Sequence, residues 1–319
     1  MPSYSVVYLE PVPADVEAIV RRCLPPEFDL RVRRPDQSVP DALREMDFVL
    51  VATTPLPAAA LAGAPRLRLI QHQGVGYDKT DVAAAAARGL PVALCPAGTS
   101  IGVAEHVFLL ILALYKQLRA AETALRGGTW LQWELRPGSY EVAGKTVGLL
   151  GLGRIGREVA VRARAFAAEV CYSDVFRAPP EAEQALGVRF VSFAELLAQA
   201  DIVSLHLPLT SATRHIIGAA ELAQMRPNAI LINTARGPLV DEPALISALQ
   251  SGQIAGAGLD VFEAEPLPAG HPLAALPNVV LTPHISAGTA DALVIKMKAC
   301  FANMQRVARG EAPHDVVTT

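Results

Sequence analysis

KTVGLLGLGRIGREVAVRARAFAAEVCYSD, residues 145–174, is the stretch of sequence that decides the fold. A short apolar run leads into Gly151, Gly153 and Gly156, which have the spacing G-x-G-x-x-G, and helix-forming residues follow. The first glycine allows a tight turn, the second lets the backbone approach a pyrophosphate, and the third lets a helix pack closely on the strand. A plain surface turn would need neither the strand nor the helix, so the sequence predicts a dinucleotide-binding turn.

Asp174 extends this prediction to the identity of the dinucleotide. It lies 23 residues after Gly151, near the ~20 residues expected for an acid that bonds the ribose hydroxyls. Such a carboxylate repels a 2′-phosphate, so NADH is expected to be preferred over NADPH, although Arg177 could soften the repulsion. We also expect cofactor contacts from Arg154 and Ile155, because they lie inside the turn at the positive N-terminal end of the helix.

The composition excludes several classes of protein. With 319 residues, two domains of ordinary size are expected, and 51% hydrophobic residues suffice for two cores. A net charge of −3 and a pI near 6.2 argue against nucleic-acid binding. The four cysteines lie far apart, and the spacing of His and Cys residues predicts no metal site. No export signal is visible, and the apolar run 107–115 is too short to span a bilayer, so we expect a cytoplasmic protein that binds no membrane.

Short apolar runs alternate with helical stretches along the whole chain, which predicts an α/β fold with parallel sheets covered on both faces. Before residue 100, the expected strands are 5–9, 28–32, 48–52, 67–71 and 92–95, and the expected helices are 14–23 and 81–88. After the glycine turn, the expected strands are 188–191, 202–207, 229–233, 257–262 and 279–282, and the expected helices are 193–199, 219–225 and 243–250. The closing helix, 289–309, has room to return to the first half, so we expect two doubly wound domains, the second nested in the first.

Residues 100–126 are predicted to form one long helix, because they are helix-forming and nearly apolar all round in the middle. Such a helix must be buried in a core or against another subunit, and we expect both. Trp130, Trp133 and Tyr140 follow in a loop that contains glycine, and their amphipathic rings also suit an interface. The sequence therefore predicts a homodimer formed through this helix.

Five further stretches resemble the D-isomer-specific 2-hydroxyacid dehydrogenases, which include glyoxylate and hydroxypyruvate reductases and phosphoglycerate dehydrogenases. In chain order they are GVGYD at 74–78, VAEH at 103–106, NTARG at 233–237, DVFEAEP at 260–266 and TPH at 282–284. The resemblance implies a flavodoxin-like substrate domain, residues 1–99 plus 287–319, with an inserted Rossmann NAD-binding domain, residues 100–286. It also implies a small 2-oxo acid or D-2-hydroxy acid as substrate.

Arg236 and His284 are the candidate catalytic residues. Reduction of a 2-oxo acid needs a group that holds a carboxylate beside a carbonyl, and the planar guanidinium of Arg236 offers suitable donors. His284 is the candidate acid–base group, because imidazole exchanges a proton near neutral pH. Glu265, rather than its loop neighbour Glu263, is the acid that the family pattern pairs with His284, where it would favour the imidazolium.

The resemblance also implies the remaining contacts. The backbone N–H groups of Val75 and Gly76 would bind the substrate carboxylate, and Asp260 would bond the nicotinamide carboxamide. The other residues expected beside the cofactor are Thr234, Ala235 and Val103. Two histidines also lie in family-like surroundings: His106 is expected to be structural, and His206 is expected either to approach the cofactor or to pack at a strand end.

Three positions depart from the common family pattern and limit the assignment of a substrate. Thr99 stands where many relatives have Asn, and His72 and Gln73 precede the glycine loop where a basic residue and a small one are common; this pair could contact a substrate tail or pack. Val75 occupies the position of a lysine in phosphite-oxidising relatives, which argues against that activity. The other alternative is an NAD-sensing interaction module similar to the C-terminal-binding corepressors, because those proteins can keep the catalytic trio.

Overall fold

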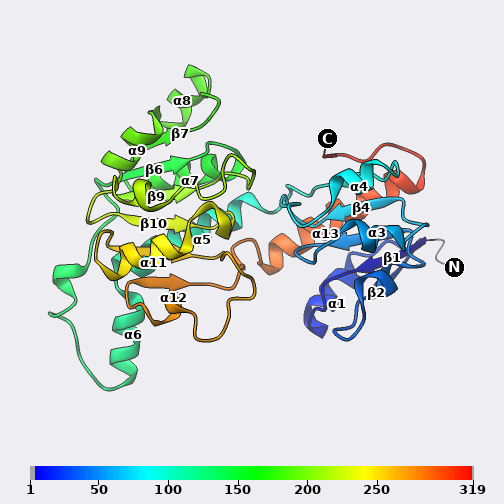
Figure 1. Cartoon of the computed structure of the whole chain (residues 1–319), viewed down its shortest axis with the longest axis horizontal. Helices are drawn as coiled ribbons and strands as arrows, with labels where there is room; N and C mark the ends of the chain where they lie inside the picture. The colour runs from blue at the N-terminus through cyan, green and yellow to red at the C-terminus, as the bar shows by residue number, and fades with distance from the viewer. Residues whose placement is uncertain (1–3, 318–319) are drawn as a thin grey trace. The chain divides into compact units, whose positions relative to one another are not determined.

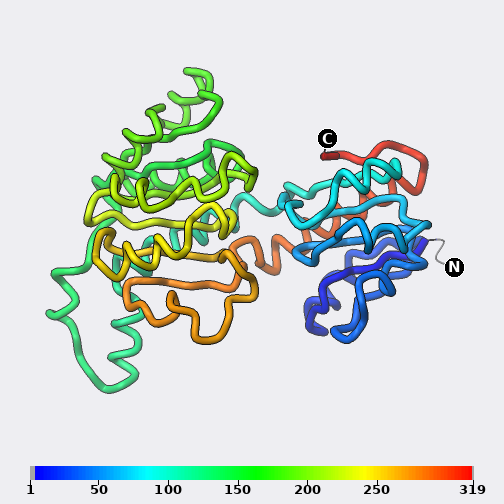
Figure 2. The backbone as a smooth tube through the Cα atoms, viewed as in Figure 1, coloured from blue at the N-terminus to red at the C-terminus, as the bar shows by residue number. Residues whose placement is uncertain are grey.

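The computed structural model describes residues 4–317 and divides into two compact units (Figure 1). Unit 1 comprises Met1–Thr99 with Gly288–Thr319, and unit 2 comprises Ser100–Ala287. The chain therefore leaves unit 1 once and returns to it with its last helix. The tube in Figure 2 shows that helix α13, in orange and red, runs beside the blue and cyan segments that begin the chain.

Unit 1 is built on a five-stranded parallel sheet of order β2-β1-β3-β4-β5, the doubly wound order of flavodoxin. Helices α1 and α13 pack on one face, and α2, α3 and α4 pack on the other. The strands are β1 Tyr4–Tyr8, β2 Phe28–Val32, β3 Phe48–Val51, β4 Leu69–His72 and β5 Val92–Ala93; the helices are α1 Ala14–Arg22, α2 Val39–Leu43, α3 Ala58–Ala62, α4 Val82–Ala86 and α13 Ala290–Ala308.

Unit 2 is built on a seven-stranded parallel sheet of order β12-β11-β10-β9-β6-β7-β8. If β6 is counted as the first strand, this is the strand order of dinucleotide-binding folds. The next two strands are added on one side of β6 and the later ones on its other side, so the strand order reverses beside β6. The strands are β6 Thr146–Leu150, β7 Glu169–Ser173, β8 Val188–Phe190, β9 Ile202–Leu205, β10 Ile230–Asn233, β11 Gly256–Leu259 and β12 Val279–Leu281.

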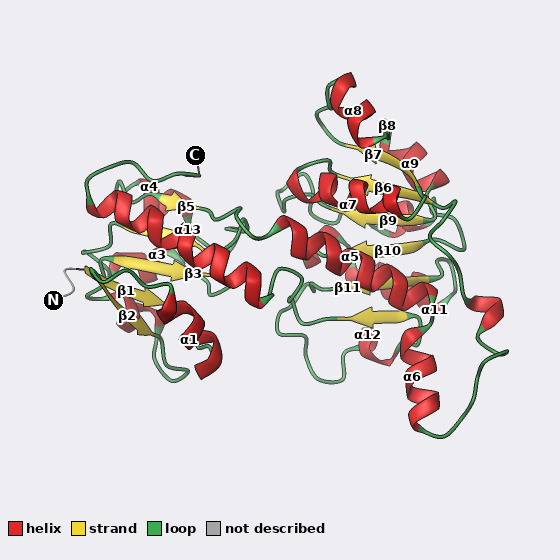
Figure 3. Ribbon diagram, turned by 180° about the vertical axis from the view of Figure 1, so that it is seen from behind, coloured by secondary structure: helices red, strands yellow, loops and turns green. Residues whose placement is uncertain are grey.

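Two apolar cores cover the two faces of the unit 2 sheet. Helices α5 and α7 contribute to one core, and α9, α10 and α11 contribute to the other. Figure 3 shows α5 lying across the sheet of unit 2 and α13 lying across the sheet of unit 1. The helices are α5 Ser100–Tyr115, α6 Leu118–Arg126, α7 Arg154–Ala165, α8 Pro180–Leu186, α9 Phe193–Gln199, α10 Ala219–Leu222, α11 Glu242–Gln250 and α12 Pro272–Ala275, with short 3-10 turns η1 Arg136–Gly138 and η2 Gly237–Leu239. The predicted class, two doubly wound parallel-sheet domains, is confirmed.

The prediction of one long helix over residues 100–126 is wrong. The chain bends by 62° between α5 and α6. Gln117 takes left-handed backbone angles there (φ 47°, ψ 40°), and a left-handed residue ends a helix. Its side-chain amide donates to the carbonyl of Leu135 and to the hydroxyl of Ser139. These contacts come from a segment that follows in sequence, so helical composition alone did not reveal the break.

Several boundaries also differ from the sequence-based prediction. β11 ends at Leu259, so residues 260–262 leave the sheet instead of continuing the strand. Helices α2, α3 and α8, each of five to seven residues, were not predicted, because short helices give weak periodic signals. Within residues 4–317, no single helix is both long enough and apolar enough to cross a bilayer, and α5 and α6 meet that test only as a bent pair.

Candidate active site

The glycine turn between β6 and α7 has the shape that a dinucleotide requires. Gly153 is the residue before the first turn of α7, and a side chain built there would meet no atom within 4 Å. Gly156 is the opposite case, because a Cβ at this position would lie 2.3 Å from the carbonyl oxygen of Gly151. The turn is therefore packed tightly on the helix side and open above the helix N-terminus, where Arg154 and Ile155 begin the helix.

Asp174 follows β7 at the same edge of the sheet as the glycine turn. Its Oδ2 accepts a hydrogen bond from the backbone N–H of Leu152 at 2.8 Å, so the acid is tied to the turn itself. The side chain is half-buried. The predicted spacing thus places a carboxylate next to the glycine turn, with lone pairs left to accept from a ligand.

Arg236 lies in a short turn that follows β10. Both polar atoms of Asn233 shape this turn, because its amide donates to the carbonyl of Arg236 (2.8 Å) and its oxygen accepts from the N–H of Ala235 (3.0 Å). Arg236 Nη1 donates to the carbonyl oxygen of Ala235 at 2.6 Å. A Cβ at Gly237 would lie 1.9 Å from the carbonyl carbon of Phe262, so only glycine lets the two loops pack together.

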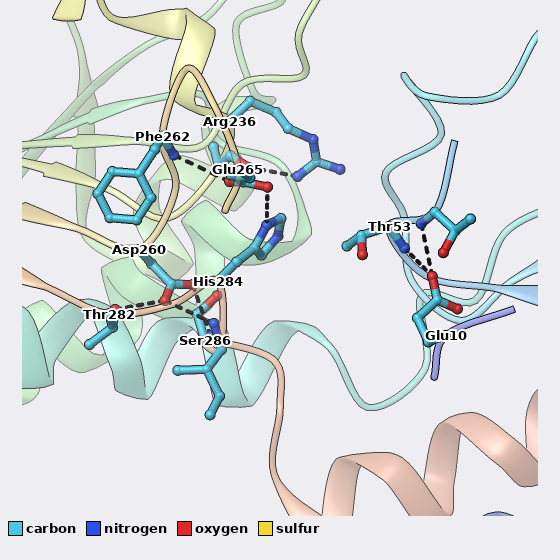
Figure 4. Close-up of polar contacts among 12 residues, drawn as sticks. Glu10, Thr53, Arg236, Asp260, Phe262, Glu265, Thr282, His284 and Ser286 are labelled. Carbon is cyan, nitrogen blue, oxygen red and sulfur yellow. Dashed lines mark hydrogen bonds and ion pairs between the residues drawn. The ribbon is translucent and has the colours of Figure 1, made fainter. Parts of the chain in front are cut away.

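His284 and Glu265 form a hydrogen-bonded pair in unit 2. Nδ1 of His284 lies 3.0 Å from Oε2 of Glu265, and the other carboxylate oxygen accepts from the N–H of Phe262 at 3.2 Å. Figure 4 shows Glu265 between the imidazole of His284 and the Arg236 loop. The His284 side chain is 31% exposed and that of Glu265 is 19% exposed. The pair is thus shielded, while the imidazole keeps access to small solutes.

Asp260 holds the backbone that carries His284. Its carboxylate is fully buried and accepts from the hydroxyl of Thr282 (2.6 Å) and from the N–H groups of Ile285 and Ser286 (both 2.9 Å). The N–H of His284 donates to the carbonyl of Asp260 at 2.8 Å. Figure 4 shows this cluster directly beside the imidazole. Asp260 therefore fixes the loop in addition to any contact it makes with a ligand.

His106 of α5 also contacts the cluster of Asp260 and Thr282. Its Nε2 lies 2.8 Å from Oγ1 of Thr282 and 3.6 Å from Oδ1 of Asp260. His106 therefore has neighbours that suit a structural role. Sequence reasoning missed Asn233 and Thr282 as positioning residues, although both lie inside the motifs that it singled out. No local pattern predicts that a threonine hydroxyl meets an aspartate more than twenty positions away.

The remaining predicted cofactor residues of unit 2 lie at the carboxyl ends of the strands or at the start of α5. Thr234 follows β10, and its Oγ1 is buried with no hydrogen-bond partner within the described residues. An unsatisfied buried hydroxyl is costly, so it is suited to bind a polar ligand group. Ala235 is half-buried beside it, and Val103 is buried in the first turn of α5.

His206 lies just after β9, on the inner side of the glycine turn. A Cβ built at Gly151 would lie 2.7 Å from the carbonyl oxygen of His206. The Nε2 atom of His206 is 2.9 Å from the hydroxyl of Ser204. Burial lowers the pKa of the imidazole from 6.5 to about 4, because water is excluded from the charged form. His206 is therefore neutral at physiological pH.

The glycine loop of unit 1 follows β4. Val75 is 39% exposed, and the carbonyl of Gly74 accepts from the N–H of Cys95 at 2.9 Å, which anchors the loop to the chain after β5. His72 is buried with Nε2 3.0 Å from the hydroxyl of Thr80, and Gln73 accepts from the hydroxyl of Tyr8 at 2.8 Å. Both residues that depart from the family pattern thus have contacts inside unit 1.

The chain just before α5 and the loop after β3 complete this description. Thr99 is buried, and its Oγ1 has no hydrogen-bond partner among residues 4–317.

Glu10 accepts from the N–H groups of Ala52, Thr53 and Thr54 at 2.8–3.0 Å and so holds the loop after β3, as Figure 4 shows for Thr53. In the described part of the chain, no three His, Cys, Asp or Glu side chains gather as metal ligands would.

Comparisons with known proteins show which proteins this chain is similar to. Residues 108–286 match the family described as D-isomer specific 2-hydroxyacid dehydrogenase, NAD binding domain. The chain is 41% identical to a glyoxylate reductase from Thermococcus litoralis over 283 residues, which are 87% of this chain and 85% of that protein. It is 45% identical to a D-3-phosphoglycerate dehydrogenase from Mycobacterium leprae over 79% of this chain but 47% of that protein. A crystal structure of a glyoxylate reductase from Paecilomyes thermophila aligns with a TM-score of 0.83 at 33% identity and covers 99% of both chains.

Proposed function

This chain belongs to the D-isomer-specific 2-hydroxyacid dehydrogenase family, and on that premise we propose that it transfers a hydride between NAD(H) and a small 2-oxo acid such as glyoxylate or hydroxypyruvate. The observation that carries the proposal is the hydrogen-bonded pair of His284 and Glu265, which shares unit 2 with Arg236 and the glycine turn. The relatives that are named glyoxylate reductases support a small 2-oxo acid as the substrate.

Arg236 is proposed to bind the substrate. Its guanidinium keeps its positive charge at any working pH and presents several N–H donors in one plane, which suits a carboxylate and the neighbouring carbonyl oxygen. Charge develops on that carbonyl oxygen during reduction, so a fixed cation close to it lowers the barrier. The close packing of Gly237 on Phe262 and the two hydrogen bonds of Asn233 hold the Arg236 backbone in place.

His284 is proposed to give a proton to the new hydroxyl during reduction and to take it back during oxidation. The bound nicotinamide supplies or accepts the hydride. Glu265 bonds Nδ1, so Nε2 is left for the substrate, and the nearby carboxylate stabilises the protonated imidazole. Asp260 holds the backbone of the loop that carries His284, because its carboxylate accepts from the N–H groups of Ile285 and Ser286.

The remaining contacts are assigned from the family pattern. In unit 1, the substrate-binding unit of this proposal, the N–H groups of Val75 and Gly76 bind the substrate carboxylate, which suits an exposed loop with glycines on both sides. In unit 2, the cofactor-binding unit, the glycine turn holds the pyrophosphate and Thr234, Ala235, Val103 and Asp260 surround the nicotinamide end. The buried hydroxyl of Thr234 supports this assignment, because it needs a polar partner.

The deciding experiment follows the oxidation of NADH in the presence of a panel of 2-oxo acids. We expect turnover with glyoxylate or hydroxypyruvate. Arg236→Ala should lower kcat/KM by about 10²–10³-fold, as expected for the loss of a charged transition-state donor. The matched control is Arg189→Ala, because Arg189 is an exposed arginine of the same unit whose side chain donates to Gln199.

Two results would contradict the proposal. Equal losses in the Arg236 and Arg189 variants would remove Arg236 from the substrate site. Tight NADH binding with no turnover of any 2-oxo acid would instead favour the NAD-sensing interaction module.

A further inference from the structure

We propose that Glu183 is a specificity-determining residue that keeps the enzyme selective for NADH by holding Arg177 away from the position of a 2′-phosphate. The inference rests on the proposed function, because it concerns the dinucleotide that unit 2 binds. Arg177 lies three residues after Asp174, in the exposed segment between β7 and α8. An unrestrained arginine at this place would be suited to bind a phosphate.

Arg177 is engaged by two parallel hydrogen bonds. Its Nε donates to Oε1 of Glu183 and its Nη2 donates to Oε2, both at 2.9 Å. This bidentate arrangement occupies two of the guanidinium's donors, and it is the strongest geometry an arginine makes with a carboxylate. The guanidinium also lies 5.5 Å from the centre of the Phe190 ring, which restricts it further.

Glu183 is itself fixed, so it can hold Arg177 in one place. The buried Tyr172 donates its hydroxyl to Oε1 at 2.7 Å and accepts from the N–H of Ala178 at 2.8 Å. The Glu183 side chain is 11% exposed, whereas that of Arg177 is 61% exposed. Hydrogen bonds from Arg177 and then Tyr172 lower the pKa of Glu183 to about 2, so the carboxylate stays charged at physiological pH.

The local charge balance points the same way. Asp174 and Glu183 are negative and Arg177 is positive, so the three side chains together carry one negative charge. A 2′-phosphate would bring further negative charge to this cluster, whereas the ribose hydroxyl of NADH would bring none. Without the Glu183 charge, the cluster becomes neutral and Arg177 gains freedom to turn toward the phosphate.

The test measures dissociation constants of NADH and NADPH by calorimetric titration, which needs no substrate and no turnover. In Glu183→Gln, we expect the ratio Kd(NADPH)/Kd(NADH) to fall about tenfold, the size of one charge-assisted hydrogen bond gained by the phosphate. Glu183→Ala should give the same fall. The Kd of NADH should change by less than about twofold, since NADH has no 2′-phosphate for the released Arg177 to bind.

Three further variants separate release of Arg177 from a simple change of charge. Glu181→Gln removes the same charge from an exposed position of the same helix and leaves the bond between Arg177 and Glu183 in place, so its ratio should match wild type. Arg177→Ala alone should leave the ratio at or above the wild-type value, because Arg177 is already engaged by Glu183 and its removal makes the cluster more negative. The double variant of Glu183→Gln with Arg177→Ala should return the ratio to that of Arg177→Ala.

Any of three results would overturn the inference: an unchanged ratio in Glu183→Gln, an equal fall in Glu181→Gln, or a fall that persists in the double variant. These results would leave the proposed function intact as long as NADH binds and 2-oxo acids turn over. Wild-type protein that binds neither dinucleotide would overturn the proposed function and this inference together. Dinucleotide binding with the expected ratios but no turnover would support the inference and count against the proposed reaction.

Discussion

His284 shows how a single residue is placed for chemistry. Its backbone has φ 51°, which lies in the left-handed region that residues other than glycine, asparagine and aspartate rarely adopt. The hydrogen bonds of Asp260 to the following two N–H groups and of Glu265 to the ring offset this cost. Strained backbone held by surrounding contacts is typical of functional residues.

The pairing of Glu265 with His284 predicts the pH dependence of the reaction. Removal of the carboxylate charge in Glu265→Gln destabilises the imidazolium, so the acid needed for reduction is lost at lower pH. We expect the pH profile of kcat/KM for reduction to move toward acid. Glu263→Gln is the matched control from the same loop and should leave the profile in place. An unmoved profile in Glu265→Gln would count against the pairing.

Asp174 is expected to exclude NADPH through its charge. In Asp174→Ala the ratio of kcat/KM for NADPH to that for NADH should rise by about tenfold, because a like charge beside the phosphate is removed. Asp174→Asn is the informative companion, since it keeps an acceptor for the N–H of Leu152 but loses the charge. A ratio that rises in neither variant would remove Asp174 from cofactor selection.

His206 makes a prediction about stability and pH. The folded protein holds this imidazole neutral, with its pKa lowered from 6.5 to about 4, so its stabilising effect is complete above pH 6.5 and is lost as the pH falls from 6.5 to about 4. We expect wild type to lose about 2 kcal/mol of unfolding free energy through this group between roughly pH 7 and pH 4.5. His206→Asn should remove that part of the pH dependence in urea titrations. His314→Asn, at an exposed position, should not, and equal slopes in all three proteins would refute the assignment.

At the scale of elements, the site depends on how closely loops approach one another. The turn after β10 and the segment after β11 touch at Gly237, where the Phe262 backbone leaves no space for a side chain. This contact connects the loop of Arg236 to the loop that leads to Glu265. The close packing at one glycine therefore helps to position two catalytic candidates.

Gly237→Ala tests this coupling. The added methyl group must push the two loops apart, so we expect a loss of about 1–3 kcal/mol in stability and a clear fall in kcat/KM. Thermal unfolding and NADH oxidation measure the two effects. Gly63→Ala is the control, because a Cβ at Gly63 would meet only one atom, the Ala60 carbonyl oxygen, at an ordinary 3.8 Å. Full activity in Gly237→Ala would show that the loops are not coupled in this way.

The elements differ in how well the sequence predicted them. The order β6, α7 and β7 was predicted correctly, because the apolar run, the glycine spacing and the helix-forming residues after it are local signals. The break between α5 and α6 was missed, because it depends on contacts of Gln117 with residues that follow in the chain. The residues of the catalytic pair were predicted from motifs, whereas the support that Thr282 and His106 give to Asp260 was not.

At the scale of the whole molecule, the amphipathic helix α6 and the loop after it expose a group of apolar side chains. Leu118 and Leu125 of α6 are 53% and 60% exposed, and Trp130 and Trp133 in the loop are 71% and 65% exposed. Figure 1 shows α6 and this loop projecting from the sheet of unit 2. Large apolar side chains gathered on such a projection are typical of surfaces that associate with another chain.

We expect the protein to form a homodimer through this surface. Sedimentation velocity should give the mass of two chains for wild type, and Leu125→Glu with Trp130→Glu should give one chain, because buried charge opposes association. Leu125→Met keeps an apolar side chain and should remain a dimer. A wild-type protein that sediments as a single chain at all concentrations would contradict the prediction.

The sequence by itself determined the features that depend on neighbours along the chain. The glycine turn, the acid after β7, the alternation of strands and helices and the motifs that contain Arg236, Glu265 and His284 are all local patterns. Only the tertiary structure decided how these motifs are supported, because contacts between distant segments depend on the packing of the whole unit. The buried carboxylate of Asp260 bonds a loop more than twenty residues away, and Glu183 of α8 accepts from Tyr172 of β7, eleven residues earlier.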